Sequence, residues 1–295
     1  MSAKNSRLAW ATAMLLGVAV IGWSVSGGAA GLDMGGESGN GPIEVLADNG
    51  IEWQQGQQRF IARGNAVASR NGVSVYADEL IAYYRSGGDA APAAPATASG
   101  ADTPMGAGSN ITRIEANGSV RIVSATETAS GSQATYNVDS GKMVLTNAHG
   151  PVTLVTPKET ITARDALEYD VRTQIAVARG KAQMVQGTRT LNADLLTAHM
   201  TQTNGKTELE TVDATGGVVI ATDKETARGS QGKYNAKTGI ATLTGSVTLT
   251  RGDSVLNGGV ATVNMKTGIS TLTGGGAEGG KARAIIAPNK IPAAQ

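Results

Sequence analysis

The sequence contains no cysteine, only two histidines, and few aromatic residues, which make up 3% of its 295 residues. Without cysteine, disulfides, thiolate metal sites and a cysteine nucleophile are all excluded. The net charge of +1 lacks the positive excess with which proteins bind nucleic-acid phosphates, so we expect no nucleic-acid partner. With so few aromatic residues, an interior must be built from Val, Ile, Leu, Ala and Thr.

Catalytic and metal-binding patterns are also missing. His149 lies in the turn "NAHGP", and His199 takes a place that Tyr holds in related segments, which favours a packing role. Asp78 and Asp194 share a column with Arg164 and three glycines, so we interpret them as turn or rim residues. A carboxylate pair for glycan cleavage stays open, although nothing singles one out. We expect no enzyme activity, no cofactor and no metal.

The N-terminus has the layout of an export signal. Residues 1–30 combine Lys4 and Arg7 with the apolar run "LAWATAMLLGVAVIGWSV" and the small residues "SGGAAG". The run is also just long enough to cross a bilayer as a helix. We favour a cleaved signal over a retained membrane anchor, and in either case the rest of the chain is exported.

Three other segments are too polar or too simple in composition to form a core. Residues 31–41 read as a flexible leader, and residues 276–295 as a flexible tail. Residues 86–110 are rich in Ala, Gly, Pro and Ser and predict a disordered insertion. The domain between leader and tail is expected to span 42–275, with this insertion inside it.

A repeat of about thirty residues runs through that domain. One anchor is a glycine, interpreted as opening a strand, and the other is a second strand 12 or 13 residues later, such as "ADELIAYY" (77–84) or "RGSQGKYN" (228–235). Forty glycines and this fixed period predict an all-β protein, a stacked antiparallel sheet of two-strand units. The anchor glycines are Gly64, Gly118, Gly150, Gly180, Gly216 and Gly245.

One face of these strands is predicted to be apolar. Residues two and four places after each glycine are apolar in every copy, and alternate residues of a strand share a face. With columns from the second strands they form an interior stripe, which is our candidate binding surface. Its members are Val75, Ile81, Val120, Ile122, Val152, Leu154, Ile161, Leu167, Met184, Leu191, Val218, Ile220, Val247 and Leu249. A further column, with Tyr83, Tyr136, Tyr169 and Tyr234, is expected to close the interior.

The motifs resemble a known family. The segment "PIEVLADNGIEWQQGQQRFIARGNAVASRNGVSVYADELIAYY" (42–84) is similar to the opening of the LptA (OstA-like) family, periplasmic proteins of lipopolysaccharide transport. The likeness covers roughly 42–275 outside the insertion, and the insertion resembles longer, alphaproteobacterial-type versions. The long apolar N-terminus and the shortage of aromatic residues depart from the pattern.

The resemblance implies a twisted, open β-jellyroll whose interior holds the acyl chains of lipid A. It also implies head-to-tail stacking with itself, with an inner-membrane LptC-like anchor and with an outer-membrane LptD-like translocon. Open jellyroll ends expose strand edges that favour such pairing. We assign the partner-binding edges to Ile43, Val45, Ala47, Val260, Val263 and Leu272.

Other interpretations remain open at this point. The chain would also fit an anchored LptC-like component, a structural β-solenoid of the cell surface, or a polysaccharide-active β-helix. The apolar stripe would equally fit a dry core, since the sequence does not show whether the interior is open.

Overall fold

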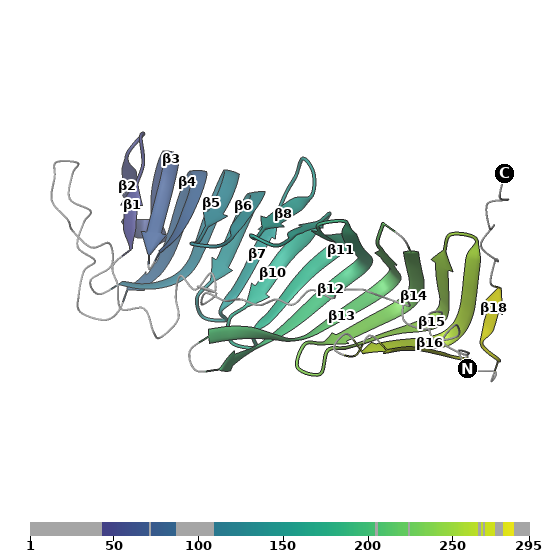
Figure 1. Ribbon diagram of the computed structural model, residues 1–295. Coiled ribbons are helices and arrows are strands. Elements are labelled where there is room, and N and C mark those ends of the chain that lie inside the picture. Colours follow the sequence, from purple (N-terminus) through teal and green to yellow (C-terminus); the bar gives the residue numbers. More distant parts are fainter. Residues whose placement is uncertain are drawn as a thin grey trace, which may run out of the picture. The chain divides into compact units, whose positions relative to one another are not determined.

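The computed structural model (Figure 1) describes residues 43–70, 72–86, 109–203, 206–223, 225–264, 267, 269–274 and 280–285. The predicted signal or anchor helix (1–30) and leader (31–41) lie outside these residues, as do most of the 86–110 insertion and most of the 276–295 tail. In the part of the chain described, no helix is long and apolar enough to cross a membrane.

The described residues form antiparallel strands joined by short turns, with one 3-10 turn, η1 (Gln55–Gln57). The predicted fold class, an all-β antiparallel β-jellyroll, is therefore confirmed. The chain divides into two compact units, and the division falls inside β11 (Ile175–Gln186), β12 (Arg189–Thr203) and β13 (Lys206–Ala221). We describe an N-terminal unit (43–182 and 199–208) and a C-terminal unit (183–198 and 209–285) separately.

In the N-terminal unit the sheet follows the chain order. Strands β2 to β6 pair with their sequence neighbours, and β1 also pairs with β3; β3 to β6 lie side by side in Figure 1. One half of β6 pairs with β7 and the other half with β8. The strands are β1 (Glu44–Leu46), β2 (Ile51–Gln54), β3 (Arg59–Arg70), β4 (Val73–Ser86), β5 (Ser109–Val123), β6 (Thr128–Asn137), β7 (Lys142–Thr146), β8 (Val152–Val155), β9 (Thr160–Ala163) and β10 (Ala166–Asp170).

The C-terminal unit continues the same pattern of hairpins. Strands β13 to β16 pair in sequence order, and β16 then pairs with both β17 and β18. These strands are β14 (Glu225–Asn235), β15 (Ile240–Arg251), β16 (Ser254–Asn264), β17 (Ile269–Thr273) and β18 (Arg283–Ile285).

The sequence pattern predicts that the anchor glycines open strands, but five of the six lie in the middle of long strands. Gly64, Gly118, Gly180, Gly216 and Gly245 all have positive φ, and so does the residue that follows each of them. The pairing register shifts by one residue at most of these positions, which marks a β-bulge. Each strand that carries such a glycine therefore bends there into two arms, as β15 shows in Figure 1.

The third repeat replaces this bend with a loop. Here β7 ends at Thr146 and β8 begins at Val152, and Gly150 has a φ of 155° rather than one near the left-handed helical value. The loop is held by hydrogen bonds from the Ala148 N–H to Ser132 Oγ, 2.8 Å, and from Asn147 Nδ2 to the Pro151 carbonyl, 3.1 Å. His149 lies exposed in this loop, which agrees with its assignment to a turn.

The opposite ends of several strands share a second repeated turn. Its first residue is Asn or Asp, whose side-chain oxygen accepts backbone N–H groups two or three residues ahead, an Asx-turn. Asn137 accepts from Ser140 at 2.8 Å, Asp170 from Thr173 at 3.0 Å, and Asn235 from Thr238 at 2.8 Å. The sequence carries this signal as "NVDSGK", "DVRTQI", "NAKTGI" and "NMKTGI".

Candidate functional site

The arms that follow each bend carry an apolar row on their inner face. In the N-terminal unit the Cα partners run continuously through seven strands, from β1 to β9. Such cross-strand neighbours are the unit of sheet stabilisation. The row is Val45, Ala68, Val75, Ile122, Ala129, Leu154 and Ile161, all buried or half-buried.

The arms that precede each bend carry a second inner row, which the sequence reading missed. It joins Ala62, Leu80, Ala116, Ala134, Leu145, Leu167 and Ala178. The signal was present, because residues two and four places before most anchor glycines are apolar, as Ala116 and Ile114 are before Gly118. Treating the glycine as the start of a strand concealed this half of the interior.

The bulges also change which side chains of β4 face the interior, and this corrects the predicted position of Ile81. Between Tyr76 and Glu79 the register of β4 shifts by one residue, so the face that holds Val75 continues through Leu80. Leu80 takes the place in the row that Ile81 was predicted to hold, and Ile81 pairs with Ile61 instead. For the same reason Tyr84, and not Tyr83 as predicted, is the buried tyrosine of β4. Tyr84 is 3% exposed, whereas the ring of Tyr83 lies 4.3 Å from the Arg113 guanidinium.

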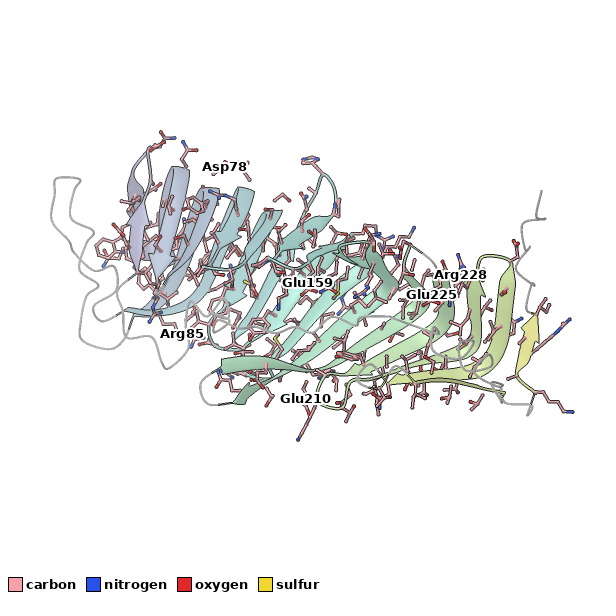
Figure 2. All side chains as sticks on the ribbon, in the orientation of Figure 1. Asp78, Arg85, Glu159, Glu210, Glu225 and Arg228 are labelled. Carbon is pink, nitrogen blue, oxygen red and sulfur yellow. The ribbon has the colours of Figure 1, made fainter. Side chains whose placement is uncertain are left out.

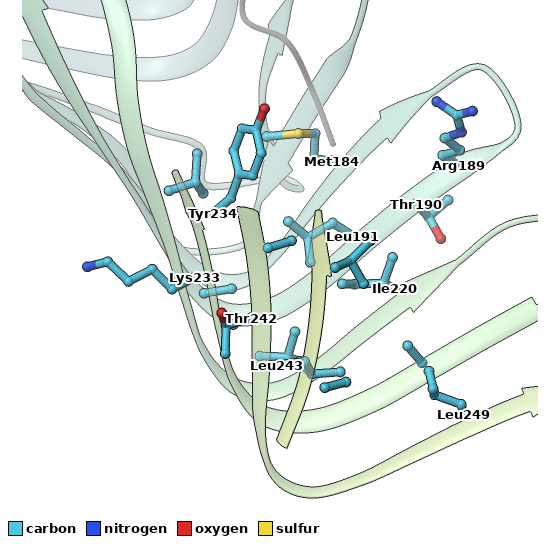
Figure 3. A pocket seen from close by; sticks show the side chains of 18 of the residues that line it. Met184, Arg189, Thr190, Leu191, Ile220, Lys233, Tyr234, Thr242, Leu243 and Leu249 are labelled. Carbon is cyan, nitrogen blue, oxygen red and sulfur yellow. The ribbon is translucent and has the colours of Figure 1, made fainter. Parts of the chain in front are cut away.

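In the C-terminal unit both arms of each bent strand line one apolar pocket. Ala214 and Val218 lie on either side of Gly216, and Leu243 and Leu249 lie on either side of Gly245. Five residues of the predicted stripe meet here: Met184, Leu191, Val218, Ile220 and Leu249. Other apolar lining residues are Val212, Ala227, Tyr234, Ala241, Ala261 and Val263. Figure 3 shows Leu191, Ile220 and Leu243 near the centre of this pocket.

The pocket has room for part of an acyl chain. Its volume is about 90 Å³, and a water-sized group needs about 10–15 Å³ by the same measure, so about six to nine methylene-sized groups fit. Gly232 contributes to this space, because it pairs with Ala214 and Leu243 and has no side chain of its own. A Cβ at position 232 would meet its neighbours only at ordinary contact distances.

Polar side chains lie at the margins of the pocket. Arg189, Thr190 and Gln186 line it near the β11–β12 turn. Lys233 points away from the apolar centre in Figure 3 and forms an ion pair with Asp213 at 3.1 Å. Burial raises the pKa of the Tyr234 hydroxyl, so this side chain is a neutral, amphipathic part of the lining.

A smaller apolar pocket of about 30 Å³ lies in the N-terminal unit. Among its lining residues are Phe60, Ala62 and Ile114 together with Ile43, Val45 and Ile81. Two of the residues assigned to the N-terminal edge, Ile43 and Val45, thus also face an apolar space. Beside it, the indole N–H of Trp53 donates to the Tyr84 hydroxyl at 2.7 Å, and Phe60 lies between the two rings.

The remaining stripe residues are placed as follows. Val120, Val152 and Val247, each two places after a glycine, are at most 1% exposed. Ile122, Ile161 and Met184 are also buried, whereas Leu154, Leu167, Leu191 and Ile220 are half-buried. The stripe thus faces inward in both units. Ile81 is buried and lines the small N-terminal pocket, although Leu80 holds its predicted place in the row.

The C-terminal edge needs a correction. Val260 and Val263 lie on β16, which pairs with β15 on one side and with β17 and β18 on the other. Their backbone is therefore inside the sheet, and Val263 is 4% exposed and lines the pocket. Leu272 lies on β17, closer to the end of the unit. Large exposed apolar side chains occur on the terminal strands at Leu46, Ile269 and Ile285.

The described residues contain no cluster of three or more His, Cys, Asp or Glu that would hold a metal ion. Asp78 and Asp194, assigned to turns or rims, pack over the bends: their carboxylates occupy the space that a Cβ on Gly118 or Gly216 would need. Asp78 is one of the residues labelled in Figure 2.

These observations define a class: an all-β protein of repeated bent hairpins with an apolar interior suited to acyl chains. A family model described as LptA/(LptD N-terminal domain) LPS transport protein matches residues 44–164 and 160–269. The chain therefore belongs to this family of lipopolysaccharide-transport proteins. Which member it is, and its alphaproteobacterial type, remain predictions.

A solved structure from Pseudomonas aeruginosa gives a weaker match. It is LptH, described as the LptA homologous periplasmic component of the lipopolysaccharide transport device. The two share 17% identity with a TM-score of 0.38, over 44% of this chain and 95% of LptH. No curated protein matches the chain.

Proposed function

We propose that the protein binds lipopolysaccharide through its lipid A acyl chains and carries it across the periplasm from the inner to the outer membrane. The pocket of the C-terminal unit is the observation that carries this proposal, because both arms of its bent strands contribute apolar side chains to one open space. In each unit the interior stripe residues, Val75 to Leu167 in the N-terminal unit and Met184 to Leu249 in the C-terminal unit, would contribute to lipid binding. No catalytic step is needed for such transfer along an apolar surface.

The proposed route requires partners at both ends. Exposed Leu46 on β1 and exposed Ile269 and Ile285 on β17 and β18 support docking of further β-strands onto the terminal strands. The partners would be an inner-membrane LptC-like anchor, an outer-membrane LptD-like translocon, and further copies of this chain head to tail. In this proposal the N-terminal edge is Ile43, Val45 and Ala47, and Leu272 is the residue of the predicted C-terminal edge that stays closest to the end.

An inner-membrane-anchored, LptC-like role is the second candidate, because residues 8–25 form an apolar run long enough to span a bilayer. N-terminal sequencing of the extracted protein separates the two. A mature chain that begins near residue 28 or 31 supports a periplasmic bridge, and an intact start in the membrane fraction supports the anchor.

Gly232 offers a test of the pocket itself. The Gly232→Leu variant places a side chain in the pocket, and its Cβ meets neighbours only at ordinary contact distances. We expect it to fold normally and to copurify with much less lipopolysaccharide, measured by mass spectrometry. Gln231→Leu adds the same side chain at the adjacent exposed position and should retain lipid as the wild type does. Unchanged lipid in a folded Gly232→Leu protein contradicts the proposal.

A photo-crosslinker gives an independent test. Placed at Ile220, which lines the pocket, it should capture lipopolysaccharide. Placed at Val219, whose side chain points to the other face of β13, it should not. Equal labelling at both positions would show that lipid contacts the unit non-specifically.

A further inference from the structure

Two glutamates of the N-terminal unit end hairpin turns of the same design. In the β5–β6 turn the Ser124 N–H donates to the Glu127 carbonyl at 2.9 Å, and the Glu127 N–H donates to Ser124 Oγ at 3.1 Å. In the β8–β9 turn Thr156 and Glu159 repeat both bonds, at 2.9 and 3.1 Å. Backbone groups and hydroxyls hold both turns, so neither turn needs the glutamate carboxylate.

The sheet brings these two glutamates together. Thr128 and Thr160 are both Cα partners of Val155, so the preceding residues, Glu127 and Glu159, lie on either side of Thr156. Neighbouring strands are about 4.8 Å apart, which places the two glutamate backbones about 10 Å apart across one small residue. Two glutamate side chains that lean toward each other span that distance.

Both side chains point to the interior. Residues two apart in a strand share a face, and two residues beyond Glu127 and Glu159 lie Ala129 and Ile161, which belong to the apolar row. Glu159 is 8% exposed, and its Oε2 is buried without a hydrogen-bond partner. Figure 2 labels this residue. A buried carboxylate oxygen with no partner is costly and therefore requires an explanation.

The titration of the pair agrees with this geometry. Burial raises the pKa of Glu159 to about 7; the nearby Lys158 opposes this shift and the Glu127 carboxylate adds to it. Burial also raises the pKa of Glu127. The third copy of the turn, Thr222 to Glu225, forms the same backbone-to-hydroxyl bond at 3.1 Å, and its glutamate is half-buried, as Glu127 is, whereas Glu159 is buried. Burial of the glutamate is thus not a property of the turn.

We propose that Glu127 and Glu159 bind one divalent cation of the Ca²⁺ type. Such a cation takes carboxylate, hydroxyl and water oxygens at about 2.3–2.6 Å, and it would provide the missing partner of Glu159 Oε2. Ser124 Oγ, which accepts the Glu127 N–H, is a third oxygen on the same row, and water completes the coordination. Two carboxylates predict weak binding, with a Kd of about 10⁻⁴–10⁻³ M, as in extracellular Ca²⁺ modules. The site does not depend on lipid in the interior.

Equilibrium dialysis of the full-length protein with radioactive Ca²⁺, after removal of bound metal by a chelator, tests this site. At about pH 8, where Glu159 is ionised, we expect about one Ca²⁺ per chain, and at about pH 5 at least tenfold weaker binding, because the ligands must lose their protons. Glu159→Gln and Glu127→Gln should each weaken binding by at least about tenfold. Glu225→Gln is the matched control and should bind as the wild type does.

Absence of binding up to about 10 mM Ca²⁺, roughly ten times the weakest expected Kd, would overturn the proposal and leave a pair that shares a proton. Binding that survives in both the Glu127 and the Glu159 variants would overturn it equally. Circular dichroism of each variant shows that it is folded, and because either glutamate alone tests the site, one misfolded variant leaves the other decisive.

Discussion

The carboxylate of Asp78 on β4 lies against the Cα of Gly118 on β5, in the space that a Cβ at position 118 would need. The Ser119 hydroxyl beside it donates toward the same carboxylate at 3.5 Å. The same relationship recurs between Asp165 and Gly180 and between Asp194 and Gly216. The bend of one strand is therefore packed by an acidic side chain of its neighbour.

Gly118→Ala should destabilise the fold for two reasons. The φ of +74° is unfavourable for an L-residue by about 1–2 kcal/mol, and the new Cβ must displace Asp78. Gly72→Ala separates the cost of the positive φ from the cost of the clash, because Gly72 has a φ of +80° but nothing near its Cβ position. We expect the urea midpoint to fall most for Gly118→Ala, less for Gly72→Ala, and hardly at all for Gly56→Ala, which has an open position and no positive φ.

The double variant Asp78→Ala/Gly118→Ala checks the cause. Removal of the carboxylate should recover the part of the loss that comes from the clash, which leaves only the φ term. If the double variant is as unstable as the sum of the single ones, the two side chains are not in contact.

These bends also explain which buried residues could be predicted from the sequence and which could not. Alternation after each glycine correctly predicted that Val120, Val218 and Val247 are buried, because side-chain direction along a strand is a local property. A bulge adds one residue and reverses that direction, so Ile81 was placed where Leu80 lies. The sequence of β4 itself does not mark this change, because the bulges lie at Gly64 of β3 and Gly118 of β5, the two strands that pair with β4.

The candidate site was predictable only in part for a related reason. Met184, Leu191 and Ile220 follow the repeat, but the openness of the pocket depends on Gly232, which lies opposite Ala214 and Leu243 on other strands. The burial of Glu159 likewise depends on β6 and β9 meeting across β8. Both features arise from pairings that no single segment encodes.

The 86–110 insertion gives a second prediction. Ser86 and Ser109 are Cα partners at the ends of β4 and β5, so a two-residue turn joins them well. Replacement of residues 87–108 by Asn-Gly should leave the fold intact and raise the free energy of unfolding by about 2 kcal/mol, because the loop to be closed is shorter. Circular dichroism and urea titration measure both. Loss of the fold would show that the insertion packs on the sheet.

Tyr84→Phe tests the aromatic group near β2. The variant removes the hydroxyl that accepts the Trp53 indole N–H at 2.7 Å and leaves this part-buried donor unpaired, which should cost about 0.5–1.5 kcal/mol. In a chain without residues 1–30, Trp53 is the single tryptophan, so its fluorescence should also shift. Tyr83→Phe, which loses a bond of 3.2 Å to Glu115 on the outer face, should leave the Trp53 emission unchanged.

The last prediction concerns the pH dependence of stability. The pKa of Glu159 rises from the ordinary 4.5 to about 7 on folding because the carboxyl is buried. The folded state therefore binds the proton more tightly, and the free energy of unfolding should fall as pH rises from about 4.5 to 7. Folding lowers the pKa of other groups, such as Asp165 and Asp170. Their contribution makes the free energy of unfolding rise with pH, but only below their ordinary pKa of 3.8, which is outside this window.

Urea midpoints measured across that window should thus decrease toward neutral pH in the wild type and decrease less in Glu159→Gln, which keeps the shape of the side chain but carries no charge. Glu127, whose pKa burial also raises, accounts for the slope that stays in this variant. Glu225→Gln should follow the wild type. If the cation site is correct, Ca²⁺ at several times its Kd should restore much of the wild-type midpoint above pH 7, by mass action on the folded state, and have no such effect on Glu159→Gln. A wild-type midpoint that rises steadily through the window would show that Glu159 is ionised and well solvated in the folded protein.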